Sequence, residues 1–428
     1  MISKKFMPNG VEDVHFNEFQ RRDSMIHKVQ KLYKSFGYRQ ILTPTFEYYD
    51  LFYGIEGTVN MDDMIKIIDE NGKILVLRPD VTTPIARMVA TNYHSSTGHL
   101  KFSYVTNVFR MNHGKTDTKR EFTQAGVEYL GNNKVEADGE IIALAIKSLL
   151  NCGIENFKLD DCGIENFKLD VGQINFFKGL LKEFNLTVQQ ERNIRNLIER
   201  KNFPELEKVI EKISGRQELK EAMLAMPYLY GSPEEVLKTA KKYILNEQME
   251  EALKNVSELC EVLSDYGYKK YIDLDLGLVN RLDYYTGIVF QGYLLNYGKE
   301  VLSGGRYDHL TQQYGYKKAA TGFGLNIDEL LKAISKDENE SFKCCSDYLI
   351  LYPVEYRKRG LNLADQLRRK GFVVETNSYT KDIQSMIQDL NYRNIKEIIQ
   401  IKKEKEIQIY SLNPKNHYKT TIEELLNQ

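Results

Sequence analysis

The sequence predicts an α+β protein in which one mainly antiparallel sheet is flanked by helices, with a helical insertion and a small C-terminal α/β domain. Three observations support this class. Strand-like runs occur in two blocks, residues 1–171 and 270–335; a charged stretch without such runs separates them at 172–269; and helices and strands alternate over residues 345–428. The length of 428 residues fits about three domains at roughly 150 residues each.

The first block begins with an amphipathic helix over residues 16–36. Its apolar residues recur at three- and four-residue steps, and Gly37 follows where a helix C-cap favours glycine. Pro44 then interrupts the extended run RQILTPTFEYYDLF, which is typical of a strand end or edge. KILVLRP is the next strand candidate, KFSYVTNVFRM and EFTQAGVEYLG predict a hairpin with a long connection, and residues 136–150 return to helical periodicity.

The second block returns to strands. IDLDLGLV, YYTGIVFQGYLL and EVLSGGRYD are strand candidates, and TGFGLNIDELLKAI passes from strand to helix. We therefore expect the two blocks to share one sheet. After Cys345 the order is DYLILYPV, a basic helix, FVVETN, a second helix, KEIIQI and EIQIYSL, which predicts a small separate domain.

One local feature is a tandem copy. Residues 152–160 and residues 162–170 both have the sequence CGIENFKLD. A single strand position holds only one copy, so the other copy must loop out or displace it. Repeats that build a fold by stacking need at least three copies, and we therefore interpret this pair as a duplication without a binding role.

The composition excludes several classes of protein. Fifty-nine Lys and Arg against sixty Asp and Glu leave a net charge of −1, which does not favour a nucleic-acid-binding surface. No apolar run approaches the roughly 20 residues of a membrane span, and the first residues lack a signal-peptide core. The five cysteines form no CxxC pair and have no partnering His spacing, so neither a zinc site nor a disulfide framework is indicated. We also expect no cofactor and no other metal. We expect a cytoplasmic protein.

Six segments resemble, in their order and spacing, the catalytic core of class II histidyl-tRNA synthetases. They are FGYRQILTPTFE, LRPDVTTPIAR, VFR followed by REFTQAGVE, LDYYTGIVF, SGGRYD and TGFGLNIDEL. The resemblance covers about residues 5–335, with a weaker similarity to the anticodon-binding domain after residue 345. It implies a class II aminoacyl-tRNA synthetase-like core, whereas the function depends on the residues of the site.

The half of the site that holds histidine in this family is retained. The resemblance implies a pocket formed by Asp80, Thr82, Arg110, Gln124, Glu128, Tyr284 and Tyr285. Asp80 and Thr82 would contact the amino group, and Arg110 suits a carboxylate or a phosphate. Gln124 and Glu128 are four residues apart in a strand pattern, so both side chains face the same way.

These residues also have structural alternatives. An Asp before a Thr is typical of a turn or a helix cap, which needs no ligand. A pair of tyrosines in a strand is typical of one core residue and one surface residue. Only the presence of all these residues together indicates a pocket.

The half that holds ATP departs from the family pattern at three positions. Asn112 stands where motif two has a carboxylate, and Asn280 stands where the signature LVRGLDYY has its arginine. Arg281 is the next residue, on the opposite face of an extended segment. Glu329 replaces the motif-three arginine, so a phosphate clamp becomes a repulsive charge that costs on the order of 3 kcal/mol at about 5 Å and an effective dielectric of about 20. The departures predict that the chain does not activate histidine.

This combination resembles the regulatory subunits of ATP phosphoribosyltransferase, a synthetase-like group in histidine biosynthesis. The resemblance implies a non-catalytic chain that is required by a short-form ATP phosphoribosyltransferase catalytic subunit in the first step of the pathway. It also implies feedback by L-histidine as effector, and a homodimer within a hetero-octamer-type assembly. Coupling of end-product binding to an oligomer interface would explain why recognition is kept while the chemistry is lost.

The C-terminal domain departs from that pattern, because many such subunits reduce or lack it. We interpret its basic residues at 357–359 and 368–370 as a solvated helix face, so tRNA is not expected as a partner. Two alternatives stay open: a degenerate but active histidyl-tRNA synthetase, and a sensor of uncharged tRNA or histidine.

Overall fold

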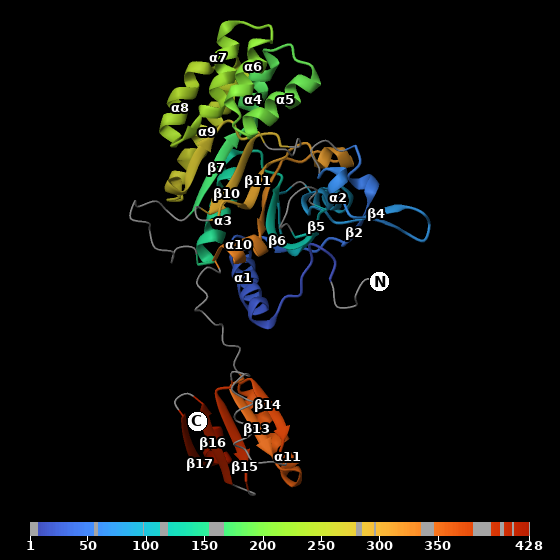
Figure 1. Ribbon diagram of the computed structural model, residues 1–428, viewed down its shortest axis with the longest axis vertical. Helices are drawn as coiled ribbons and strands as arrows, with labels where there is room; N and C mark the ends of the chain where they lie inside the picture. Colours follow the sequence, from blue (N-terminus) through green and yellow to red (C-terminus); the bar gives the residue numbers. More distant parts are fainter. Residues whose placement is uncertain are drawn as a thin grey trace. The chain divides into compact units, whose positions relative to one another are not determined.

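The computed structural model describes residues 7–54, 59–96, 98–111, 119–153, 167–279, 285–294, 297–334, 346–379, 395–402, 406–412 and 415–427 (Figure 1). Contacts between residues divide the chain into two compact units, the first built mainly from residues 22–337 and the second mainly from residues 338–428. Among the helices of these described ranges, none is both long enough and apolar enough to cross a lipid bilayer.

A nine-stranded mixed sheet forms the centre of the first unit. Its strand order is β1-β5-β6-β12-β11-β10-β7-β9-β8, and all neighbours are antiparallel except the parallel pairs β1–β5 and β7–β9. In that order the strands are β1 (Arg39–Gln40), β5 (Leu100–Phe109), β6 (Glu121–Leu130), β12 (Ala320–Asn326), β11 (Glu300–Arg306), β10 (Ile288–Leu294), β7 (Phe167–Gln173), β9 (Ile272–Asp275) and β8 (Tyr230–Gly231). Since β12 lies between β6 and β11, the two sequence blocks share one sheet, and the predicted fold class is confirmed.

Helices cover both faces of this sheet (Figure 1). α1 (Phe16–Ser35), α3 (Val135–Asn151) and α10 (Ile327–Ile334) share a core with alternate residues of β6, Ala125 and Val127 among them. α2 (Thr82–Asn92) shares a second core with Tyr104 of β5. Because strand side chains alternate, the intervening positions of β6, which include Gln124 and Glu128, lie on the α2 face.

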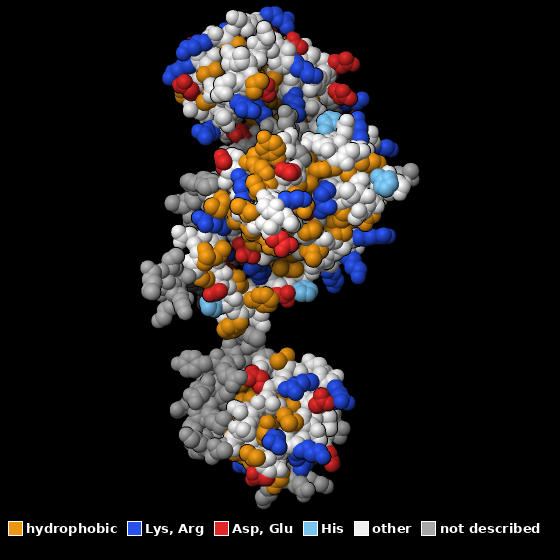
Figure 2. All heavy atoms as spheres, turned by 90° about the vertical axis from the view of Figure 1, so that its right-hand side faces the viewer, with side chains coloured by type: hydrophobic (Ala, Val, Ile, Leu, Met, Phe, Trp, Pro, Cys, Tyr) orange, Lys and Arg blue, Asp and Glu red, His pale blue; other side chains and the backbone are white. Residues whose placement is uncertain are grey.

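Pro44 splits the extended run after α1 between two sheets. β1 precedes it in the large sheet, whereas β2 (Phe46–Tyr48) follows it in a separate three-stranded antiparallel sheet with β4 (Ile74–Leu77) and β3 (Lys66–Ile68). This small sheet exposes large hydrophobic side chains, with Phe46, Ile68 and Ile74 at 53%, 75% and 45% exposure. Figure 2 views this side of the molecule and shows hydrophobic side chains among lysines and arginines.

The charged stretch at 172–269 is mainly helical. Its helices are α4 (Ile174–Lys182), α5 (Val188–Glu199), α6 (Phe203–Glu211), α7 (Gln217–Ala225), α8 (Pro233–Ala240) and α9 (Glu247–Asp265). The expectation that it carries no strand is wrong, since β7 extends into it and the two residues of β8 pair with β9. A two-residue strand is too short for a periodic signal. The predicted boundaries at 1–171, 172–269, 270–335 and 345–428 stay predictions.

The second unit contains a five-stranded sheet in the order β14-β13-β15-β16-β17. Its elements are β13 (Tyr348–Tyr352), α11 (Arg357–Arg369), β14 (Val374–Ser378), β15 (Glu397–Ile401), β16 (Glu406–Leu412), β17 (Lys415–Thr421) and α13 (Ile422–Asn427). Sequence analysis missed β17 and α13, and the expected second helix falls in 380–394, outside the described residues. Arg357, Lys358 and Arg369 of the basic helix are exposed, as expected for a solvated face.

The tandem copy is only partly described. Residues 167–170, the end of the second copy, form the start of β7. Residues 154–166, which hold most of both copies, lie outside the described residues.

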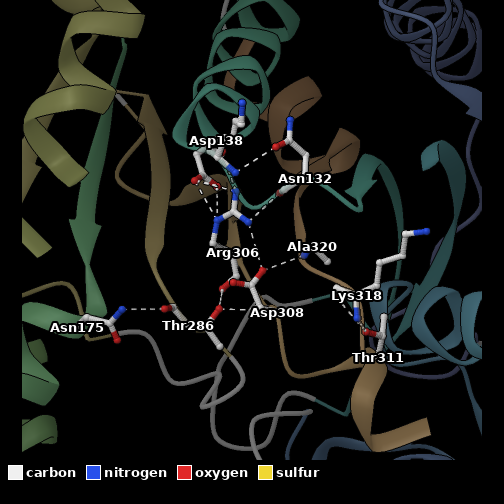
Figure 3. A network of polar contacts seen from close by, with 10 residues as sticks. Asn132, Asp138, Asn175, Thr286, Arg306, Asp308, Thr311, Lys318 and Ala320 are labelled. Atoms are coloured by element: carbon white, nitrogen blue, oxygen red, sulfur yellow. Dashed lines mark hydrogen bonds and ion pairs between the residues drawn. The ribbon is translucent and has the colours of Figure 1, made fainter. Parts of the chain in front are cut away.

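A buried ion pair ties β11 to α3 (Figure 3). The Arg306 guanidinium lies 2.9 Å from the Asp138 carboxylate, and the two side chains are 8% and 2% exposed. Arg306 also donates to the carbonyl of Asn132 at 3.0 Å and to Asp308 at 3.2 Å. A buried guanidinium is tolerated only where such partners surround it, so Arg306 fixes the end of β11 against the start of α3.

Replacement of Arg306 should therefore destabilise the first unit strongly. We expect Arg306→Leu to lower the free energy of unfolding by about 3–5 kcal/mol, because Asp138 is left as a buried carboxylate without its partner. Chemical unfolding of Arg306→Leu and of Lys254→Leu tests this, since Lys254 forms an exposed pair with Glu258 and its loss should change little. Equal effects of the two substitutions would contradict the structural role of the buried pair.

Candidate functional site

A cavity of about 930 Å³ lies on the α2 face of the large sheet. Its volume is within the range of about 300–1,000 Å³ that is usual for small-molecule sites. Six of the predicted pocket residues line it: Asp80, Thr82, Arg110, Gln124, Glu128 and Tyr285. They come from α2, β6 and the ends of strands that are far apart in the sequence. Tyr284, Asn112 and Asn280 lie outside the described residues.

Glycines on β12 make room for the two polar side chains of β6. Gly322 pairs with Glu128 across the strands. A Cβ at Gly322 would overlap the Glu128 carboxylate, and a Cβ at Gly324 would overlap the Gln124 amide. The two side chains can therefore lie flat over β12 only because these positions lack side chains.

Glu128 is buried at 1% exposure and accepts two hydrogen bonds. Thr82 Oγ1 donates to its Oε1 at 2.7 Å, and the Tyr307 hydroxyl donates to its Oε2. Burial raises the pKa of Glu128 to about 7; the two hydroxyl donors lower it in part, and the nearby Asp80 charge adds to the rise. The carboxyl can therefore change its protonation state near neutral pH.

Asp80 has one partnered and one unpartnered oxygen. Its Oδ1 accepts from the Thr83 backbone N–H at 2.7 Å. This is the helix-cap role that was expected if Asp80 had a structural function alone. Its Oδ2 is buried and has no hydrogen-bond partner among the described residues. Burial raises the pKa of Asp80, while the Thr83 N–H and the Arg110 charge lower it in part. A buried carboxylate oxygen without a partner is the arrangement that a bound cation would complete.

Two arginines fix the segment that carries Asp80. Arg78, 2% exposed, donates to the carbonyls of Thr43 and Pro44 at 2.7 Å each and to the carbonyl of Asn107 at 2.9 Å. Arg110 Nε donates to the Pro79 carbonyl at 2.8 Å. Arg110 also lines the cavity, so it supplies positive charge on the Asp80 side.

The wall of the cavity towards α5 is acidic. Asp170 of β7 and Asp275 of β9 line it, and burial, followed by the charges of Asp275 and Asp273, raises the pKa of Asp170 to about 6. Lys201 crosses to this wall from the turn between α5 and α6, with Nζ 3.4 Å from Asp275 Oδ2 and 4.4 Å from the centre of the Tyr230 ring. Its φ of 49° lies in the left-handed region, which is unusual for a lysine.

Glu329 does not lie among the described residues that line the cavity. Its carboxylate accepts from the Tyr297 hydroxyl at 2.5 Å and lies 3.7 Å from Lys299 and 3.4 Å from Lys332. The repulsive charge expected at a phosphate position is thus placed beside two lysines instead.

Sequence analysis missed Tyr307 as a site residue. It belongs to the SGGRYD segment, one of the six segments that resemble the synthetase core, and its hydroxyl contacts Glu128 directly. A single tyrosine at the end of a strand has no sequence pattern that would mark it as a site residue. For metals, the part of the chain that the structure describes contains no group of three or more His, Cys, Asp or Glu residues placed to hold an ion.

Comparison with known proteins decides the family. A family model described as histidyl-tRNA synthetase matches residues 10–330. The ATP phosphoribosyltransferase regulatory subunit of Acetivibrio thermocellus is 37% identical over 423 residues, 99% of each chain. The chain belongs to the family of ATP phosphoribosyltransferase regulatory subunits. Membership confirms the predicted resemblance and the expectation of a regulatory rather than an enzymatic role.

Solved structures agree with the regulatory-subunit family and with its fold. A protein of Bacillus halodurans described as an ATP phosphoribosyltransferase regulatory subunit/histidyl-tRNA synthetase matches with a TM-score of 0.82 and 29% identity, covering 94% of this chain and 99% of that one. A histidyl-tRNA synthetase from a Nostoc species matches with a TM-score of 0.80 over 99% and 98% of the two chains. At 17% identity the second match supports the fold alone.

The raised pKa of Glu128 makes the stability of the chain depend on pH. The folded protein holds this proton up to about pH 7, whereas an ordinary Glu loses it near 4.5. The stabilisation is therefore complete below about pH 4.5 and is lost as the pH rises to about 7. Relative to Glu128→Gln, we expect the free energy of unfolding of the unsubstituted chain to fall by about 2 kcal/mol between pH 5 and pH 7.5.

The control for this measurement is Glu136→Gln, which changes an exposed glutamate at the start of α3. Chemical unfolding of that variant should follow the unsubstituted chain at both pH values. If Glu128→Gln also follows it, then Glu128 does not hold a proton in the folded state.

Proposed function

We propose that this chain is a histidine-responsive regulatory subunit that supports a short-form ATP phosphoribosyltransferase catalytic subunit. One observation carries the proposal: six residues predicted for a histidine pocket line one cavity, and one of them, Asp80, has a buried carboxylate oxygen without a partner among the described residues. The names of its relatives supply the enzyme that is regulated.

The charges of the cavity match the two ends of an amino acid. Asp80 Oδ2 would receive the α-ammonium group, and Arg110 would receive the carboxylate. Gln124, Glu128 and Tyr285 would surround the imidazole ring, whose two nitrogens need one donor and one acceptor in the neutral form. The proton on Glu128 near neutral pH allows it to take either role. Tyr284 is included from the resemblance.

Feedback would follow from reciprocal coupling. If histidine binding favours one arrangement of the assembly, then that arrangement binds histidine more tightly by the same factor. A subunit that keeps the histidine pocket can couple histidine binding to the arrangement of the assembly without any ATP chemistry of its own. Asn112, Asn280 and Glu329 are the sequence positions at which we propose that the chemistry was lost.

For the assembly we propose a homodimer within a hetero-octamer-type complex in the cytoplasm, without tRNA. Ile68 of β3 and Ile74 of β4 are paired across the two strands and exposed, which supports a protein partner for the core, because neighbouring exposed apolar side chains often mark interaction sites. The overall charge of −1 argues against tRNA.

The direct test is reconstitution with a short-form catalytic subunit. We expect phosphoribosyl transfer to ATP only when both chains are present, and inhibition of that activity by L-histidine. Asp80→Asn should keep the activation but shift the histidine concentration for half inhibition upward by at least about tenfold, because asparagine retains the helix cap while the negative charge is lost. The control is Asp265→Asn at the exposed end of α9.

Two outcomes would favour the alternatives. Histidine-dependent exchange of pyrophosphate into ATP, at a rate like that of a bacterial histidyl-tRNA synthetase measured in parallel, would indicate an active synthetase. Micromolar, salt-dependent binding of uncharged tRNA would indicate a sensor. Absence of any activation of the catalytic subunit would contradict the proposal.

A further inference from the structure

The first two turns of α4 hold the backbone that carries Tyr285. The carbonyls of residues 285–287 each accept one hydrogen bond from these turns. Lys178 Nζ donates to the first at 3.1 Å, Asn175 Nδ2 to the second at 2.9 Å, and the backbone N–H of Ile174 to the third at 3.1 Å. Three consecutive carbonyls are thus bound by one helix end, one of them by a backbone N–H that has no partner within the helix and two by side chains.

The sequence places these donors together. β7 ends at Gln173, and its side chain caps α4 by accepting from the Asn175 backbone N–H at 2.9 Å. The Gln173 amide also donates to Asn255 of α9 at 2.8 Å, which ties the helix start to the rest of the helical stretch. Asn175 and Lys178 are three residues apart, so their side chains leave the helix on the same side.

The same backbone is held from the opposite side by β11 (Figure 3). The Thr286 N–H donates to the Arg306 carbonyl at 2.7 Å, and the Asp308 N–H donates to Thr286 Oγ1 at 3.0 Å. Figure 3 shows Thr286 between Asn175 and Asp308, with Arg306 and Asp138 beyond. The segment therefore lies between a helix start and a strand whose position is fixed by the buried ion pair.

The backbone position determines where the Tyr285 ring lies. The ring is in close contact with Gly305, where a Cβ would lie 2.9 Å from two ring atoms. Tyr285 is only 6% exposed and lines the cavity. A ring packed this tightly has no freedom to compensate for a shift of its own backbone, so a displacement of α4 would displace the tyrosine hydroxyl.

We propose that Asn175 and Lys178 are positioning residues for Tyr285, through which α4 sets the affinity of the cavity for histidine. The inference rests on the proposed function, since histidine is the ligand whose binding is affected. It adds that the helical stretch takes part in the site without touching the ligand, and that a partner that moves α4 would change histidine binding.

The test is calorimetric titration of L-histidine into the full chain and into an Asn175→Ala, Lys178→Met double variant. We expect the dissociation constant to rise by about tenfold, because two hydrogen bonds to the backbone are lost and the hydroxyl shifts. Lys182→Met, an exposed substitution at the end of the same helix, should leave it unchanged. Thermal unfolding checks that each variant is folded. If the double variant is not folded, then Asn175→Ala alone replaces it, with an expected rise of about threefold in the dissociation constant.

A purely structural role is excluded by repeating the pair of substitutions in a Tyr285→Phe background. If Asn175 and Lys178 act through the Tyr285 hydroxyl, then Tyr285→Phe itself weakens binding and the pair changes affinity less than twofold in that background. The same loss in both backgrounds, or no loss in either, overturns the inference while leaving the proposed function intact. Failure of the unsubstituted chain to bind histidine would overturn the proposed function, and this inference with it.

Discussion

The close approach of β6 to β12 at two glycines is the constraint on which the site depends. A buried carboxyl in the middle of a nine-stranded sheet is costly unless it is solvated by protein groups. Gly322 and Gly324 give Glu128 and Gln124 the space to lie over the sheet. The Thr82 hydroxyl of α2 and the Tyr307 hydroxyl at the end of β11 then donate hydrogen bonds to the Glu128 carboxyl. The position of α2, and with it Asp80, follows from this contact, because Thr82 bridges the two elements.

One short segment links that site to the stability of the unit. In SGGRYD, the second glycine packs against Tyr285, Arg306 forms the buried ion pair with Asp138, and Tyr307 donates to Glu128. Three consecutive residues at the end of β11 thus pack against the tyrosine, form the buried ion pair and contact the Glu128 carboxyl. Under the function that we propose, this sharing would explain why an amino-acid pocket is kept while the groups for ATP chemistry are lost, because the residues of the cavity also hold the sheet together.

Much of the fold was predictable from the sequence, because long periodic segments such as α1 and the β5–β6 hairpin have strong local patterns. The common face of Gln124 and Glu128 followed from the two-residue period of a strand. The features that were not predicted depend on tertiary contacts. The two residues of β8 are too few for a periodic pattern, and their strand is defined by its pairing with β9. Tyr307 reaches Glu128 only because β12 brings β11 and β6 together, and Glu329 contacts Tyr297 and does not line the cavity. For Asp80, sequence offered a helix cap or a ligand contact, and its two oxygens have different surroundings that allow both.

The central claim is that the unpartnered oxygen of Asp80 is the receptor for the ammonium group of histidine. Calorimetric titration with L-histidine and with imidazolepropionate, which lacks only the α-amino group, tests it most directly. The account predicts that imidazolepropionate binds at least about 100-fold more weakly, because Asp80 would stay unpaired, and that Asp80→Asn reduces this difference to less than about tenfold. Equal affinity of the unsubstituted chain for the two compounds would contradict the account.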